Sequence, residues 1–315
     1  MAERAPIAIV GSTASGKTAL SLAVARRLPV EIVSMDSRQV YRGMDIGTAK
    51  ATPAERAAVP HHGLDLVSPA ERYGAGRFGR DARRWIEEIE ARGKVPLLVG
   101  GTGFFLRALT HPIFQQPELD PEARAALDAE LEALDDAELH RHLAELDPET
   151  AERLRGWGGR QRLLRALELP LLTGKPLSWW HRHAPPEAEP VVPRVFVVDV
   201  PREVLDAAID RRVGGMVEAG LLDEVRALVA QGYDERSPGM RAHGYQELLP
   251  HLRGEIALEE ALDAVRRATR AYSRRQLTWF RNQLPPGAVW LDGTWPVEAL
   301  AEHIVESTEN GIGQD

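Results

Sequence analysis

The chain has 315 residues, 43% of them hydrophobic and 27% charged, with no cysteine and a formal net charge of −8. This composition is that of a globular protein of one or two domains; it excludes disulfides and thiolate metal sites, and the acidic total argues against general nucleic-acid binding. No run of about 18 apolar residues predicts a membrane span and no secretory leader is recognisable, so we expect a cytoplasmic protein.

The first predicted element is a buried strand over residues 7–10, followed directly by the segment GSTASGKT. This segment matches the P-loop pattern G-x-x-x-x-G-K-[ST], and a helical segment follows it, as the motif requires. The glycines let backbone N–H groups turn toward one phosphate at a helix N-terminus. We expect Lys17 to neutralise phosphate oxygens and the Thr18 hydroxyl to hold Mg²⁺. The expected phosphate contacts are Gly11, Ser12, Thr13, Ala14, Ser15, Gly16, Lys17 and Thr18.

Two further strands are predicted over residues 31–35 and 95–99. Asp36 follows the first of them, and Thr102 follows the second after two glycines. The carboxyl ends of parallel strands meet at one edge of a sheet, which is where ligands bind. Taken alone, Asp36 is read as a strand-end cap and Thr102 as a helix N-cap, with a catalytic role for either left open.

The middle of the chain has a different pattern. Residues 115–190 are predicted to form an all-helical insertion, and a Pro-rich connector at its end leads to a strand over residues 195–200. That strand reads VFVVD and ends at Asp199, which is either a magnesium-organising acid or a turn or cap residue. A last strand is predicted over residues 289–291. The expected organisation is a P-loop NTPase-like α/β core with a parallel sheet (1–114 and 191–306), the insertion (115–190) and a disordered tail (307–315).

Two basic segments stand out against the acidic total. Residues 153–165 hold five arginines and residues 266–281 hold six, and neither segment contains an acid. Local charge decides what a polyanion experiences within a Debye length of about 8 to 10 Å. Arg266, Arg270 and Arg274 recur every four residues and form a stripe suited to an RNA backbone, the alternative being a solvated helix face.

Five segments in the expected order resemble the tRNA dimethylallyltransferase family: GSTASGKT, DSRQVYRGMDIGTAK, LLVGGTGFFLRAL, GRQRLLRALE and GMRAHGYQELL. The resemblance covers residues 6–282, and its second segment is far more specific than a P-loop. It implies an enzyme that transfers a dimethylallyl group from dimethylallyl diphosphate to the N6 amine of the adenosine 3′ of the tRNA anticodon. The P-loop would then bind the diphosphate leaving group with Mg²⁺, and the insertion would grip the anticodon loop.

The resemblance also implies roles for individual residues. Asp36 matches the general base, Thr102 matches a residue that orients the amine, and Arg212 matches an arginine that contacts the diphosphate. Lys17 would stabilise the charge of the leaving group. Phe105 stands where the family often has a tyrosine, so a hydroxyl is missing there. The implied tRNA contacts are Asp36, Ser37, Arg38, Gln39, Thr102, Arg124, Gln161, Arg162, Leu163, Leu164, Arg165, Arg241, Gly244, Tyr245, Arg270 and Arg274.

Three other functions are weighed against this one. A P-loop kinase of a small metabolite, with Asp36 as base and Asp199 near Mg²⁺, would explain the loop but not the insertion or the arginines. A non-catalytic RNA-binding ATPase would leave Asp36 and Thr102 without a task. Prenyl transfer to free adenylate would require neither the insertion nor the basic segments. We expect a monomer that acts on tRNA and has no membrane partner.

Overall fold

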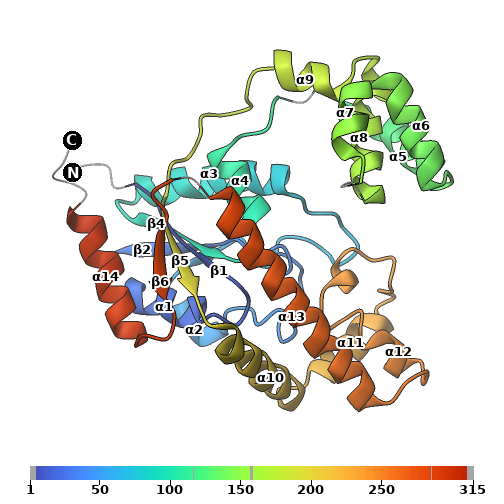
Figure 1. Cartoon of the computed structure of the whole chain (residues 1–315). Coiled ribbons are helices and arrows are strands. Elements are labelled where there is room, and N and C mark those ends of the chain that lie inside the picture. The colour runs from blue at the N-terminus through green and yellow to red at the C-terminus, as the bar shows by residue number, and fades with distance from the viewer. Residues whose placement is uncertain (1–4, 116, 157–158, 285, 311–315) are drawn as a thin grey trace. The chain divides into compact units, whose positions relative to one another are not determined.

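The structure, a computed structural model, describes residues 5–115, 117–156, 159–284 and 286–310. It divides into two compact units, one formed by the chain up to His111 together with the chain from Pro190 onward, the other by Pro112–Glu189. The first is an α/β core and the second is helical (Figure 1). The predicted fold class, a P-loop-like α/β core with a parallel sheet plus a helical insertion, is confirmed. Among the described residues, no helix is long and apolar enough to cross a membrane.

The core is built on a six-stranded parallel sheet with the order β3-β2-β4-β1-β5-β6. Strands β1, β4 and β5 are short, nearly continuous apolar runs that are buried on both faces, which is why their sequences lack a polar alternation. The two-residue β3 was not predicted, because two histidines make no apolar run. The strands are β1 (Ile7–Gly11), β2 (Val30–Ser34), β3 (His61–His62), β4 (Val95–Gly100), β5 (Arg194–Asp199) and β6 (Val289–Asp292).

Helices cover both faces of this sheet. Helices α1 (Lys17–Ala25) and α14 (Val297–Asn310) lie together on one face, and α3 (Ala75–Ala91) and α4 (Gly103–Thr110) lie on the other (Figure 1). The chain leaves β1 toward β2 and leaves β4 toward β5, in opposite directions along the sheet. The topological switch point therefore lies between β1 and β4, and ligands of open α/β sheets bind at such points.

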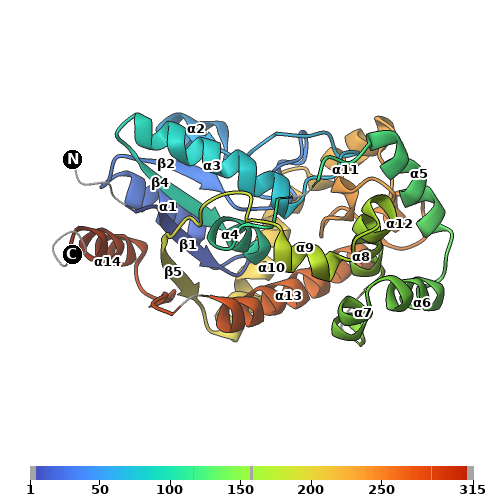
Figure 2. The same cartoon turned by 90° about the horizontal axis from the view of Figure 1, so that it is seen from above.

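Most of the remaining core helices follow β5, and α2 lies between β2 and β3. The 26-residue α13 (Leu258–Gln283) lies alongside α10 (Arg202–Glu218), as Figures 1 and 2 both show. The other elements of the core are α2 (Pro53–Ala58), α11 (Leu221–Ala230), the short 3₁₀ turn Gly239–Arg241 and α12 (Leu249–Leu252).

The helical unit has a small core of its own, made chiefly of leucines from three helices. Its acidic sequence is partly explained by capping, since Asp120, Asp135 and Asp147 each accept a backbone N–H at a helix start. The helices are α5 (Pro121–Glu132), α6 (Asp136–Leu146), α7 (Pro148–Leu154), α8 (Arg160–Thr173) and α9 (Leu177–His183).

The prediction of a disordered tail over residues 307–315 is wrong for residues 307–310. Helix α14 continues to Asn310, and Thr308 is buried with its hydroxyl donating to the carbonyl of Ile304. The amphipathic period of this helix continues past Ser307 and buries one side against the core, which a reading based on tail composition overlooked. Residues 311–315 of the predicted tail and residues 157–158 of the first basic segment lie outside the described residues.

Candidate active site

The P-loop connects β1 to α1 and lines a cavity of about 550 Å³. Gly16 has φ 89°, a left-handed conformation that favours glycine and lets the loop curl back. A Cβ at Gly11 would lie 2.7 Å from the carbonyl oxygen of Val198, so only glycine fits where β1 meets β5. Lys17 reaches across the loop, its Nζ donating to the carbonyl of Ser12 at 2.5 Å. The loop is therefore shaped as a phosphate cradle with its cation in place.

Two cations, Lys17 and Arg212, line this cavity together with the carboxylates of Asp36 and Glu55. The pKa of Lys17 is lowered to about 7, chiefly by burial and also by the charge of Arg212, while the charge of Asp36 opposes both. Burial also lowers the pKa of Arg212, again opposed by Asp36. Placing two cations close together in a buried cavity costs free energy, and an anionic ligand such as diphosphate relieves that cost.

Asp36 and Thr102 are brought together by a hydrogen-bonded junction between the ends of β2 and β4. The N–H of Met35 donates to Val99 at 2.7 Å, and the N–H of Thr102 donates back to Met35 at 3.1 Å. The Thr102 hydroxyl accepts the N–H of Ser37 at 3.1 Å, so it does not cap α4 as the simplest reading of the sequence supposed. Thr102 thus fixes the turn that carries Asp36.

Asp36 lies where the P-loop cavity meets a second, smaller one of about 90 Å³. Its Oδ1 accepts the N–H of Arg38 at 2.8 Å, which orients the carboxylate. The smaller cavity is lined by groups from three regions of the core, including Met216, His243 and Gly244. A carboxylate between two cavities can accept a proton from a group bound in one cavity while that group reacts with a molecule bound in the other. The residues that line both cavities are Thr13, Asp36, Thr48, Arg212 and Tyr272.

Gln276 on α13 is a site residue that sequence reasoning missed. Its Oε1 accepts the N–H of Thr13 at 2.8 Å, and its Nε2 donates to the carbonyl of Gly101 at 2.8 Å. A Cβ at Gly101 would lie 2.2 Å from that Nε2, so the glycine is needed for the close approach. Gln276 therefore connects the P-loop to the end of β4. The only signal in the sequence that points to it is its place within the basic segment of residues 266–281.

We expect Gln276→Ala to weaken pyrophosphate binding about tenfold, because two hydrogen bonds worth about 0.5 to 1.5 kcal/mol each are lost and the Thr13 N–H is left unpaired. Isothermal titration calorimetry with pyrophosphate and Mg²⁺ measures this change. Gln231→Ala at the exposed end of α11 is the control and should change nothing. An unchanged affinity in Gln276→Ala would show that the connection has no effect on the loop.

Glu224 on α11 was also missed, and it explains much of the segment DSRQVYRGMDIGTAK. Its carboxylate accepts the backbone N–H groups of residues 45, 46 and 47 and the hydroxyl of Tyr245. A Cβ at Gly47 would lie 2.5 Å from the Tyr245 ring. Glycine and tyrosine are therefore required together, and the segment between Asp36 and Lys50 is held as one rigid loop.

Three of the expected RNA contacts have other roles. The prediction for the Tyr245 side chain is wrong, because the ring is fully buried and its hydroxyl donates to Glu224 at 2.5 Å. The prediction for Leu163 is wrong for the same reason, since its side chain lies in the core of the helical unit. The Gln39 amide is used internally, donating to the carbonyls of Thr48 and Ala49. An apolar or aromatic residue on the apolar side of an amphipathic segment is expected to be buried in the core before a surface contact is considered.

In the helical unit, the exposed RNA candidates gather at the start of α8. Gln161, Arg162 and Arg165 are exposed, while Leu164 is half-buried against the leucine core. Arg165 and Arg124 both pair with Glu168, a buried carboxylate that holds the two guanidinium groups together. The four polar side chains thus form part of the surface of the helical unit.

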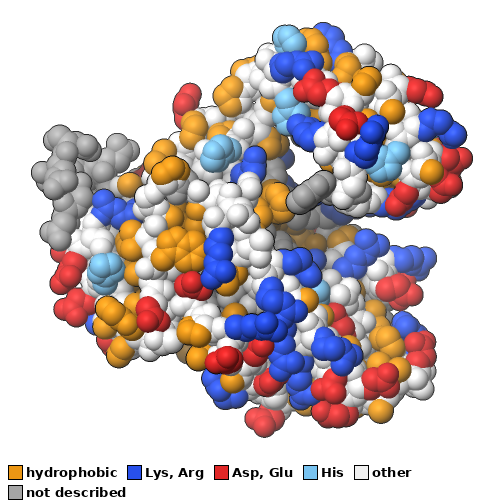
Figure 3. All heavy atoms as spheres, in the orientation of Figure 1, with side chains coloured by type: hydrophobic (Ala, Val, Ile, Leu, Met, Phe, Trp, Pro, Cys, Tyr) orange, Lys and Arg blue, Asp and Glu red, His pale blue; other side chains and the backbone are white. Residues whose placement is uncertain are grey.

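In the core, the arginines of α13 do not form one free stripe. Figure 3 shows basic side chains gathered over α13, but several are engaged by acids. Arg266 pairs with Glu259 and Asp263, and Arg270 bonds Asp210 at 2.5 and 2.6 Å. Residues 266–281 contain no acid, but the acids that pair with their arginines lie in the preceding turns of α13 and on α10. The sequence segment alone therefore overstated how many of these arginines are free. The other exposed candidate of the core, Arg241, donates to the carbonyl of Glu235.

Asp199 does not line the P-loop cavity. It forms a 3.5 Å ion pair with Arg281 and lines a different cavity, which removes the support for a magnesium-organising acid at the loop. The cap reading is wrong too, because α10 begins after Pro201 without a side-chain cap. The histidine pair of β3 is structural: His61 bonds Val59, and His62 bonds Glu31.

The residues present are suited to Mg²⁺ at the P-loop. Among the described residues, no group of three or more His, Asp or Glu side chains is arranged to hold a metal. Mg²⁺ does not need such a group, because it keeps several waters and takes one or two protein oxygens together with phosphate oxygens. The Thr18 hydroxyl lines the cavity and is an oxygen donor of this kind.

Binding of diphosphate should depend on pH through Lys17. Diphosphate stabilises the charged ammonium, so binding raises a pKa that is about 7 in the free protein. Above pH 7, Lys17 of the free protein must take up a proton when diphosphate binds. The Kd for diphosphate should therefore rise about tenfold per pH unit. Lys17→Arg stays charged at every pH, so it corrects for titration of the ligand. A wild-type to Lys17→Arg ratio of Kd values that is flat from pH 7.5 to 8.5 would refute this.

A phosphate loop at the switch point of a parallel sheet, with a carboxylate beside it, places the chain in the class of P-loop α/β proteins that act on phosphorylated substrates. Within this class the chain belongs to the IPP transferase family, whose model matches residues 39–283. An isopentenyl transferase model also matches residues 6–60. The resemblance of the five sequence segments to the tRNA dimethylallyltransferase family is thereby confirmed.

Individual relatives are similar over nearly their whole length. The chain is 46% identical over 300 residues to a tRNA dimethylallyltransferase of Anaeromyxobacter sp. (strain K), covering 95% of this chain and 97% of the relative. A full-length tRNA isopentenylpyrophosphate transferase structure from Bacillus halodurans is 37% identical with a TM-score of 0.69, covering 98% and 97%. A eukaryotic dimethylallyltransferase acting on tRNA is 27% identical with a TM-score of 0.83, covering 99% and 80%.

Proposed function

We propose that this protein transfers a dimethylallyl group from dimethylallyl diphosphate to the N6 amine of the adenosine 3′ of the anticodon in tRNA, releasing diphosphate. The observation that carries the proposal is the position of Asp36, which lines both the phosphate cavity and the smaller cavity beside it. A base at a junction suits a reaction in which donor and acceptor enter from different sides.

The chemistry follows from the charges at this junction. Asp36 accepts a proton from the exocyclic amine as the nitrogen forms its bond to the prenyl carbon. The C–O bond to diphosphate breaks, and negative charge develops on the departing oxygen. Lys17, Arg212 and the loop N–H groups stabilise that charge where it forms. Thr102 holds the turn of Asp36 and borders the adenine.

Mg²⁺ would be held by Thr18 and by phosphate oxygens, and when bound it supplies further charge neutralisation at the diphosphate. Phe105, the departure from the family pattern, is buried and stacks on Phe78 with ring centroids 4.1 Å apart. A tyrosine hydroxyl there would point into an aromatic core, so its loss does not weaken the proposed mechanism.

The acceptor is proposed to be a base in tRNA rather than free adenylate. The remaining candidates for RNA contact come from both units. In the core they are Ser37, Arg38 and Arg241, with Gly244 buried at the smaller cavity. In the helical unit they are Arg124, Gln161, Arg162, Leu164 and Arg165. We propose that residues 115–190 grip the anticodon loop and that residues 1–114 and 191–306 carry the chemistry. Flipping the adenosine out of its stack costs a few kcal/mol, and such contacts offset it. Arg270 and Arg274 line a separate cavity, so the proposal does not rest on them.

Incubation with unmodified tRNA and labelled dimethylallyl diphosphate tests the function. Label should appear on the adenosine 3′ of the anticodon and depend on Mg²⁺. Two parallel reactions decide against the alternatives, one with AMP as acceptor and one with γ-labelled ATP as donor. Faster labelling of AMP than of tRNA, or phosphate transfer from ATP, would refute the proposal. A single chain holds all the residues named, so we propose that a cytoplasmic monomer is sufficient.

A further inference from the structure

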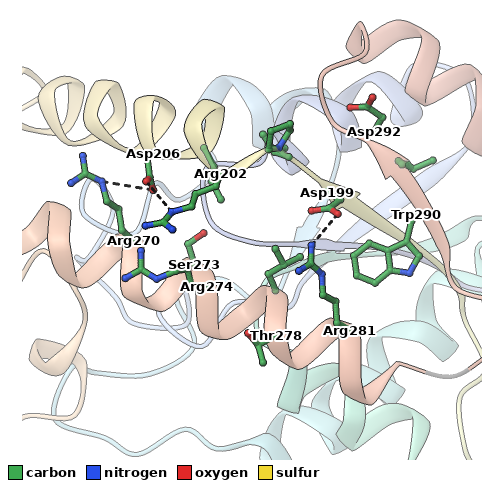
Figure 4. A pocket seen from close by; sticks show the side chains of 15 residues that line it. Asp199, Arg202, Asp206, Arg270, Ser273, Arg274, Thr278, Arg281, Trp290 and Asp292 are labelled. Carbon is green, nitrogen blue, oxygen red and sulfur yellow. Dashed lines mark hydrogen bonds and ion pairs between the residues drawn. The ribbon is translucent and has the colours of Figure 1, made fainter.

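A cavity of about 690 Å³ lies between α10 and α13 at the ends of β5 and β6, and we call it the α10–α13 cavity (Figure 4). Helix α13 separates it from the P-loop cavity. Tyr272 and Gln276 face the P-loop, whereas Ser273, Arg274 and Leu277 face the α10–α13 cavity. Its volume lies in the range of about 300 to 1,000 Å³ that small-molecule sites occupy. The proposed reaction makes no use of it.

The cavity offers cations that are free to bind an anion. Arg274 has no hydrogen-bond or ion-pair partner among the residues that the structure describes. Arg202 pairs with Asp206 at 3.7 Å and Arg281 pairs with Asp199 at 3.5 Å, both longer than a good charged hydrogen bond of about 2.7 to 2.9 Å. Exposed pairs of this length contribute little, so either arginine can turn to a ligand at small cost.

A buried hydroxyl points independently to a ligand. Ser273 is 1% exposed, and its Oγ has no hydrogen-bond partner within the described part of the chain. In Figure 4 this hydroxyl extends from α13 toward Arg202 on α10. Leaving a buried hydroxyl unpaired is unfavourable, and a hydrogen bond to a ligand oxygen would remove that cost. Helix α10 also begins at this cavity without a side-chain cap, so its first N–H groups add donors.

Strand β6 contributes an apolar surface to the same cavity. Trp290 on β6 is 41% exposed and lines the cavity beside Arg281. An indole face that remains exposed next to an arginine is suited to stacking a planar ring such as a nucleobase. Arginines and an aromatic plane in one cavity match a molecule with a phosphate and a base.

We propose that the α10–α13 cavity binds a free nucleoside phosphate. Its phosphate contacts Arg274 and Arg281, the Ser273 hydroxyl donates to a phosphate oxygen, and the base stacks on Trp290. The free form is favoured over a nucleotide within RNA, because Ser273 is 1% exposed and the phosphates of a duplex lie on its outer surface. The site is distinct from the P-loop and does not depend on the proposed function.

Equilibrium dialysis of labelled AMP against the full-length protein tests the site, with saturating pyrophosphate and Mg²⁺ present to fill the P-loop. Arg274→Gln should weaken AMP binding about tenfold or more, because a charged phosphate contact is lost. Ser273→Ala and Trp290→Leu should each weaken it severalfold. Arg267→Gln is the matched control, since Arg267 is exposed on α13 but does not line the cavity. Thermal melting shows whether each variant is folded.

Three outcomes would overturn the proposal. The first is that no AMP binds once pyrophosphate fills the P-loop, or that Arg274→Gln binds it as well as the wild type does. The second is that an anticodon stem-loop RNA displaces AMP competitively, which would make the cavity part of an RNA surface. The third is that ribose 5-phosphate binds as tightly as AMP, which would show that stacking of the base on Trp290 does not contribute to binding. Retained AMP binding in the presence of the stem-loop supports the free-nucleotide site.

Discussion

Replacing Asp36 by asparagine is expected to lower kcat for prenyl transfer to tRNA by about 10² to 10⁴, the usual contribution of a general base. Asparagine keeps an oxygen that can accept the N–H of Arg38 at the position of Oδ1, so the turn should survive. The amide cannot take a proton from the amine. Single-turnover kinetics on preformed complexes should show the loss in the chemical step, and filter binding should show little change in the Kd for tRNA.

The donor concentration matters in this experiment. Asp36 raises the pKa of Lys17, so Asp36→Asn lowers the charged fraction of that lysine and weakens diphosphate binding. Saturating dimethylallyl diphosphate and a pH near 6.5 separate this effect from the loss of the base. Asp223→Asn at the exposed start of α11 is the matched control. Turnover within threefold of the wild type in Asp36→Asn would eliminate Asp36 as the base.

Replacing Lys50 by methionine is expected to lower the free energy of unfolding by about 2 to 4 kcal/mol. The Lys50 side chain is fully buried, and its ammonium donates to the carbonyl of Tyr41 and to Asp45 and Asp65 at 2.6 to 2.7 Å. Breaking a buried ion pair from one side typically costs about 3 to 5 kcal/mol. The lower figure allows for the partial exposure of both carboxylates. Urea unfolding followed by circular dichroism measures the change.

The control for this substitution is Lys94→Met. Lys94 is partly exposed and pairs with Glu31, which keeps Arg92 as a partner when the lysine is removed. We expect a loss of no more than about 1 kcal/mol there. Equal losses in the two variants would show that burial of Lys50 contributes nothing particular. Because Lys50 closes the loop that begins at Asp36, Lys50→Met should also lose activity before global unfolding as temperature rises.

Several parts of the fold were predictable from short stretches of sequence. The apolar runs of β1, β4 and β5 identify strands buried on both faces, because such strands need no polar alternation. The P-loop is predictable since its glycines, lysine and threonine act through local backbone geometry. The two-residue β3 and the last turns of α14 lack a local signal of comparable strength, and their ends depend on what they pack against.

The RNA-facing residues show the limit of spacing arguments. The arginine stripe on α13 was read from a four-residue period, yet Asp210 on α10 engages Arg270. Tyr245 and Leu163 sit in motif positions and turn inward because burying an aromatic ring or a leucine is worth about 1.5 to 3 kcal/mol. A motif shows that a residue matters to the family but not which face it occupies.

We could infer from short stretches of sequence the phosphate loop, the strand ends that carry Asp36 and Thr102, and the family of the chain, because each of these is recorded in residues that are neighbours in the chain. The three-dimensional fold was needed to show that Gln276 and Glu224 hold those segments in place, that Asp36 lies between two cavities, and that α13 has a second cavity behind it. These contacts join residues far apart in sequence, and their geometry is set by how helices pack on the sheet, which no local pattern encodes.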